Sequence, residues 1–176
     1  MKNIRSQQNR HKVKEAFTLL ETLLYISVFS VVVFLIIGVY GLVVESKVRQ
    51  RTVSEVNAEG GRIMQMITQT VRNSTSINSP LPANNSSVLS VYGLVTANNP
   101  TLYYLVGNDM VIKEGSAASI ILNSNRVKIS NLKFTNLSES GTHGTVKIEF
   151  TVAANTLNTR TIYQFSQNFA SDATVR

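Results

Sequence analysis

Residues 14–21 read Lys14-Glu15-Ala16-Phe17-Thr18-Leu19-Leu20-Glu21, and they open an apolar run with no charged residue from position 22 to position 44. A basic, polar leader precedes this junction and ends at a small residue, Ala16. An ordinary signal peptide has its cleavage site after the apolar stretch, whereas here the small residue stands before it. This order indicates that the leader is removed and that the apolar segment is kept.

The apolar segment is long enough to cross a membrane. A bilayer core of about 30 Å needs roughly 20 helical residues, and residues 22–44 are apolar on every helical face, which favours lipid or a helical core over an amphipathic surface role. The basic leader predicts a cytoplasmic N-terminus. Lys47, Arg49 and Arg51 on the far side weigh against that orientation, and Glu45 offsets them in part.

Composition limits the other classes of function. The 176 residues carry a net charge of +7, of which residues 1–16 supply +4, so the basic balance is a weak indication of nucleic-acid binding. The chain has no Cys, which excludes disulfides, thiolate zinc sites and cysteine nucleophiles. The length allows one modest domain plus an anchor.

Glu21 is the unusual residue of the junction. A carboxylate in an apolar helix is costly unless it is paired, so an ionisable residue there is a functional hypothesis. If the chain is cut after Ala16, the new α-amine of Phe17 lies one helical turn from Glu21, and it can pair with Glu21 of the same chain or of a neighbour. The alternative is that Glu21 lies at the membrane boundary, in contact with water and without a role.

These residues resemble the class III signal of type IV pilins and type II secretion pseudopilins, in which a basic leader ending in Gly precedes Phe-Thr-Leu-Leu/Ile-Glu and a hydrophobic helix. The resemblance covers roughly residues 10–44, with a match at each of residues 17–21 and with Ala16 where the family usually has Gly. It implies that a membrane prepilin peptidase cuts between Ala16 and Phe17 and N-methylates Phe17. It also implies that Glu21 serves assembly by neutralising the N-terminal amine of an adjacent subunit.

The C-terminal half resembles the J-type minor pseudopilins and W-type minor pilins, in Asn131-Leu132-Lys133-Phe134, in residues 146–152 and in the tail from residue 163 to 176. The implied role is that of a structural minor subunit of a type IV pilus or a type II secretion pseudopilus, without a cofactor and not an enzyme. The implied partners are prepilin peptidase, other pilin subunits through the N-terminal helix, the inner-membrane assembly platform, and membrane lipid before assembly. The implied location is the bacterial inner membrane, crossed once with the N-terminus cytoplasmic, and then an extracytoplasmic filament.

Helical periodicity continues beyond the apolar segment. A stripe at spacings of three or four predicts an amphipathic helix to about Ile77, ended by the prolines at 80 and 82. Gly60 lies on this stripe, so it either lets a strand approach closely or, with Gly61, breaks the helix; Gly38 and Gly41 leave continuity open in the same way. The stripe consists of Val53, Val56, Gly60, Ile63, Ile67 and Val71.

From residue 79 the chain is expected to form one or two antiparallel sheets of seven short strands. Gly107-Asn108-Asp109 predicts a hairpin turn, and a change of phase near Ser130-Asn131 predicts a bulge. The other expected strands are residues 87–92, 118–122, 146–152 and 161–169. The predicted fold is α+β, a pilin-like lollipop, with a cleaved basic leader (1–16), a transmembrane or filament-core helix (17–44), an amphipathic helix continuing into the globular domain (45–78) and an antiparallel β domain (79–176).

Other candidate sites are weak. His11 and His143 are isolated, so no metal site is predicted, and no catalytic constellation or phosphate loop is present in the sequence. Arg126, Lys128 and Lys133, with Lys147, either form a basic face for phosphates or are the solvated side of a sheet, and nucleic acid is therefore an unfavoured partner that is not excluded. The rival to the filament subunit is a single-pass membrane-anchored β-rich binding domain that does not polymerise.

Overall fold

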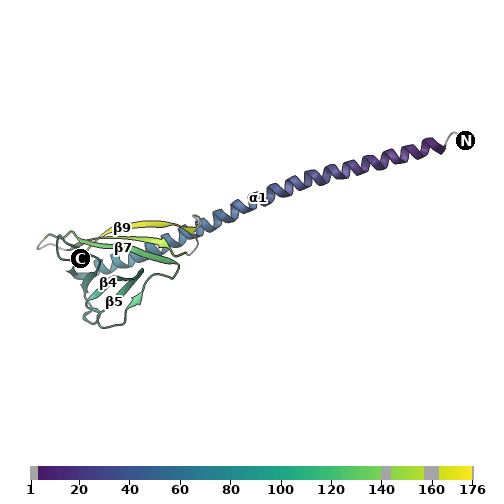
Figure 1. The fold of residues 1–176 in the computed structure, drawn as a ribbon. Helices are drawn as coiled ribbons and strands as arrows, with labels where there is room; N and C mark the ends of the chain where they lie inside the picture. The colour runs from purple at the N-terminus through teal and green to yellow at the C-terminus, as the bar shows by residue number, and fades with distance from the viewer. Residues whose placement is uncertain (1–3, 140–143, 157–162, 176) are drawn as a thin grey trace. The chain divides into compact units, whose positions relative to one another are not determined.

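The computed structural model describes residues 4–139, 144–156 and 163–175, with the backbone alone for residues 4–17. One helix, α1 (Ile4–Arg72), comes first, and all the strands follow it. The chain divides into two units, Met1–Lys47 and Val48–Arg176, so that the last part of α1 belongs to the same unit as the strands (Figure 1).

Helix α1 continues through Gly38, Gly41, Gly60 and Gly61, which settles the question of continuity that the sequence left open. It is also long and apolar enough to cross a membrane. The helix ends at Arg72, however, and the expectation of a helix to about Ile77, with a boundary at residue 78, was wrong.

The early end of α1 has a local cause. The next residues are mostly Ser, Thr and Asn, whose side chains compete for backbone hydrogen bonds and disfavour a helix interior. Ser74 Oγ donates to the carbonyl of Val71 at 2.6 Å. The segment Ser74–Ser79 then forms strand β1, which pairs with β3.

Two antiparallel sheets follow, which confirms the α+β class. The first has the order β1 (Ser74–Ser79), β3 (Leu89–Gly93), β4 (Thr101–Val106), β5 (Asp109–Glu114), β6 (Ile120–Ile121). The second has the order β2 (Asn85–Ser86), β7 (Val127–Asn136), β8 (Thr145–Ala154), β9 (Ser166–Thr174). A short 3-10 helix, η1 (Thr96–Asn98), lies between β3 and β4.

The predicted hairpin and the predicted bulge are both present. Val106 pairs with Asp109 across the turn, and Gly107 has a φ of 63° while Asn108 has no positive φ, the pattern of a type II′ turn. In β7 the register with β8 shifts between Ser130 and Lys133, and Asn131 has a φ of 53°. The buried positions change parity at this point, so both halves of β7 face the core.

The bounds predicted from the sequence for the last strand were wrong. It was expected over residues 161–169, whereas β9 is Ser166–Thr174; residues 161 and 162 lie outside the described residues. The aromatic residues Tyr163 and Phe165 suggested a strand, but regular pairing with β8 begins only at Ser166 and continues to Thr174. Pairing with a long partner strand therefore outweighs the low β-propensity of Asp172 and Ala173. Of the expected strand at residues 118–122, only β6 forms, and that at 87–92 begins at Leu89.

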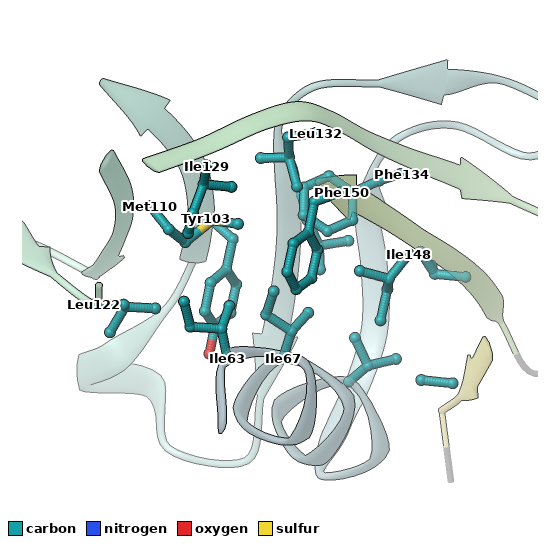
Figure 2. Packing of buried hydrophobic residues seen from close by; sticks show 14 of the residues in the cluster. Ile63, Ile67, Tyr103, Met110, Leu122, Ile129, Leu132, Phe134, Ile148 and Phe150 are labelled. Atoms are coloured by element: carbon teal, nitrogen blue, oxygen red, sulfur yellow. The ribbon is translucent and has the colours of Figure 1, made fainter. Parts of the chain in front are cut away.

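The core lies between the last turns of α1 and the two sheets. Figure 2 shows Ile63 and Ile67 rising from the helix towards Tyr103 and Phe150, which come from different sheets. The helical stripe predicted from sequence is buried at Val56, Ile63, Ile67 and Val71. Gly60 is buried on the same stripe, where a Cβ would come within 2.2 Å of the Phe169 ring, so the glycine permits close packing and does not break the helix.

Candidate functional site

The candidate site is the junction at which the apolar part of α1 begins. Ala16 and Phe17 lie in the helical backbone of α1, and Glu21 follows Phe17 by four residues on the same helix. Side chains are described from Thr18 onwards, and from there to Lys47 nearly every one is exposed.

Glu21 has a hydrogen-bond partner that the sequence analysis missed. The phenol of Tyr25 donates to Oε1 of Glu21 at 3.0 Å, across a spacing of four residues. Side chains four apart on a helix lie on one face, so the signal was present in the spacing. The two residues place a carboxylate and a phenol together near the start of the apolar segment.

Other hydroxyl groups in this segment bond to the helix itself. Thr22 Oγ1 donates to the carbonyl of Leu19 at 2.9 Å, and Ser27 Oγ donates to that of Leu24 at 2.8 Å. Ser30 Oγ does the same with Ile26 at 2.7 Å. Such bonds satisfy the hydroxyls without water, as lipid requires.

The apolar side chains of residues 19–44 have no cover within the described chain. None of the most apolar stretch of α1 is buried, and Phe34 is 79% exposed. A contiguous apolar surface of this size marks a membrane or a protein interaction site. The junction therefore combines one carboxylate, one phenol and a helix that must be covered by lipid or by another protein.

A second group of charges lies where α1 meets the β strands. Glu55 Oε1 accepts from Arg51 at 3.2 Å and from Arg126 at 2.7 Å, so one carboxylate joins the helix to the start of β7. Arg62 bonds to Glu59 at 2.8 Å and also to the carbonyl of Leu122. All of these groups are partly exposed, and each pair contributes about 0–1 kcal/mol, so they help to fix the helix on the sheet.

The basic residues of the four-stranded sheet do not form an uninterrupted positive face. Lys147 Nζ lies 2.9 Å from Glu149 Oε1, and the hydrogen bond to Glu149 raises the pKa of Lys147. Lys133 pairs in register with Glu149, and Arg126 is bonded to Glu55. Acidic neighbours of this kind disfavour phosphate binding, so the solvated-sheet interpretation is the better one.

The described residues present no candidate metal site. Among the described residues no three His, Cys, Asp or Glu side chains lie together as metal ligands require. His143 lies outside the described residues, and the side chain of His11 is not described. A hollow of about 470 Å³ between the end of α1 and strands β3 to β5 is lined mostly by Thr, Asn, Val and Gly, with Glu114 as its one ionisable group. The lining of this hollow supplies no paired nucleophile and base.

No protein-family model, curated protein or solved structure matches the chain. The proposal of a function therefore rests on the residues of the junction and on the fold.

Proposed function

We propose that this chain is a structural subunit of a pilin-type filament, processed by prepilin peptidase and assembled into a type IV pilus or a type II secretion pseudopilus. The observation that carries the proposal is the order of Ala16, Phe17 and Glu21 at the opening of a long, uncovered apolar helix. Cleavage falls between Ala16 and Phe17, and Phe17 becomes the N-methylated first residue. Glu21 pairs with the amine of Phe17 on an adjacent subunit.

The helix has the properties that such a subunit needs. It is uninterrupted across residues 17–44, it is apolar on all faces, and its hydroxyl groups at Thr22, Ser27 and Ser30 are bonded internally. A segment of this kind is stable in lipid and equally able to pack against apolar helices of other subunits. The buried hydrophobic residues begin at Val56, so the apolar segment does not contribute to the core of the β domain.

The location and partners follow from the same role. Before assembly the subunit crosses the bacterial inner membrane once, with its N-terminus cytoplasmic, and afterwards it lies in the extracytoplasmic filament. Its partners are lipid, prepilin peptidase, the assembly platform and other subunits. The resemblance of the C-terminal half to minor pilins and pseudopilins supports the role of a minor subunit.

Neutralising Glu21 tests the assembly step. Glu21→Gln removes the charge that pairs with the amine, while Glu45→Gln removes a charge at the far end of the same apolar segment. We expect Glu21→Gln to leave the chain in the membrane and to deplete it from filaments sheared off the cell surface, and Glu45→Gln to behave as wild type. Equal recovery of both variants in the sheared fraction would refute the assembly role of Glu21.

A single-pass membrane anchor carrying a β-rich binding domain is the second candidate. It is supported by an apolar helix long enough to cross a membrane by itself and by a β domain that belongs to a separate unit. An anchor of this kind keeps its leader, whereas a filament subunit loses 16 residues. The state of the N-terminus therefore separates the two functions.

A further inference from the structure

Tyr25 is placed to act on the one charged group of the apolar segment. Between residues 18 and 44 Glu21 is the only residue with a charge, and the Tyr25 phenol donates to its Oε1 at 3.0 Å. Tyr25 itself is 61% exposed and makes this contact from the face it shares with Glu21. The hydrogen bond is therefore not a by-product of core packing.

The other hydroxyl groups that follow Glu21 in the segment are bonded to the helix or distant from the carboxylate. Those of Thr22, Ser27 and Ser30 donate to main-chain carbonyls of the helix. Tyr40 is 19 residues beyond Glu21, which corresponds to about 28 Å along an α-helix. Tyr40 thus shares the chemistry and the apolar surroundings of Tyr25 but cannot reach the carboxylate.

A phenol is suited to this position. A carboxylate among apolar groups is costly unless its oxygens accept hydrogen bonds, and bonds to a charged acceptor are stronger than neutral ones. A carboxylate has two oxygens with about four acceptor sites, so a bond from Tyr25 leaves capacity for a cation. The aromatic ring of Tyr25 adds apolar surface that lipid tolerates.

We propose that Tyr25 is a positioning residue for Glu21. In the membrane its phenol holds the carboxylate against the helix and satisfies one oxygen; during assembly it stays bonded while the other oxygen receives the amine of a neighbouring subunit. The first part is a property of this chain in lipid, and the second part rests on the proposed function.

Infrared spectroscopy of the full chain in lipid nanodiscs tests the contact directly. The difference spectrum between the wild type and Glu21→Gln isolates the carboxyl bands of Glu21, and it is repeated in the Tyr25→Phe and Tyr40→Phe backgrounds. We expect the Glu21 band to shift in Tyr25→Phe and to keep its position in Tyr40→Phe. The same band position in both backgrounds overturns the proposal.

Assembly tests the second part. We expect Tyr25→Phe to lower the share of chain in sheared filaments about tenfold, the effect of losing a hydrogen bond to a charged group, and Tyr40→Phe to leave it unchanged. In a Glu21→Gln background Tyr25→Phe should have no further effect, because the two residues act through one contact. An undiminished share in Tyr25→Phe, or a further loss in the double variant, overturns this part.

The two experiments distinguish a failure of the proposed filament function from a failure of the proposed role of Tyr25. If the wild-type chain forms no filaments, the proposed function and the assembly role of Tyr25 fall together. The infrared comparison needs no filament, so it still decides whether Tyr25 holds Glu21.

Discussion

At the scale of single residues, the packing of α1 on β9 depends on the missing side chain of Gly60. A Cβ there would lie 2.2 Å from the ring of Phe169, which is stacked on Phe150 with a centroid distance of 5.6 Å. The neighbouring Gly61 has nothing within 4 Å of an added Cβ. A side chain is therefore excluded at Gly60 and has open space at Gly61, so Gly61 is a matched control for substitution of Gly60.

We expect Gly60→Ala to lower the free energy of unfolding by about 1–3 kcal/mol, because the Phe169 ring must move. Gly61→Ala should raise it by up to about 1 kcal/mol, since alanine favours a helix interior where space is open. Denaturant unfolding of the full chain in detergent measures both values. Equal stability of the two variants would show that Phe169 does not pack on Gly60.

The burial of Tyr103 makes the stability of the β domain fall at alkaline pH. It is fully buried, and burial raises the pKa of its phenol above the ordinary value of 10.0. The Thr70 hydroxyl, 2.7 Å away, donates to the carbonyl of Met66, so the phenol donates to Thr70. A raised pKa in the folded state means that stability is complete below about pH 10 and is lost as the pH rises from there through the folded pKa.

The change Tyr103→Phe tests this linkage. It should cost about 1 kcal/mol at neutral pH, for the lost hydrogen bond, and it should make the decline in unfolding free energy above about pH 10 shallower than in the wild type. Tyr104→Phe, on the same strand, controls for the loss of a phenol. An unchanged alkaline decline in Tyr103→Phe would show that this group is not responsible.

At the scale of the secondary-structure elements, the bulge in β7 keeps both halves of that strand facing the core. Asn131 has a φ of 53°, a conformation that asparagine and glycine adopt with little strain and that a β-branched residue disfavours. We expect Asn131→Val to lower the free energy of unfolding by about 1–2 kcal/mol, and Asn131→Gly to lie close to the wild type. Thermal unfolding of the Asn131→Val and Asn131→Gly variants, both at an exposed position, measures the difference in stability. If Asn131→Val were as stable as the wild type, β7 would pair with β8 without the bulge.

The sequence predicted the elements whose side chains alternate between core and solvent. Local spacing of residues was enough to predict four features: the stripe on α1, the alternation of β8, the bulge in β7 and the turn at Gly107. Strand β1 was missed and β9 was misplaced, since their residues are mainly Ser, Thr, Asn and Ala. Those strands exist because they pair with β3 and β8, and pairing with a strand elsewhere in the sequence leaves little local signal.

The candidate site was predictable to a similar degree. Glu21 and its neighbours at Ala16 and Phe17 are evident from charge and order alone. The bond from Tyr25 depends on a rotamer that brings its phenol back to the preceding turn, which spacing permits but does not require. The link from Glu55 to Arg126 joins positions 71 residues apart and had no sequence signal.

At the scale of the whole molecule, the two units meet the demands of different surroundings. The apolar side chains described up to Val44 are exposed, whereas the core of the β domain begins at Val56 and lies against two sheets. A domain that is stabilised without Cys and without the apolar segment can keep its fold whether that segment is in lipid or against other subunits. The state of the N-terminus therefore decides whether the chain is a filament subunit.

Intact mass and N-terminal peptide mass spectrometry of the protein from its native membrane test that claim most directly. We expect a mature chain that has lost residues 1–16 and begins at N-methylated Phe17, with Ala16 accepted at the cut. A chain that still begins at Met1, in cells with an active prepilin peptidase, would contradict this expectation, and Glu21 would then have no amine to pair with.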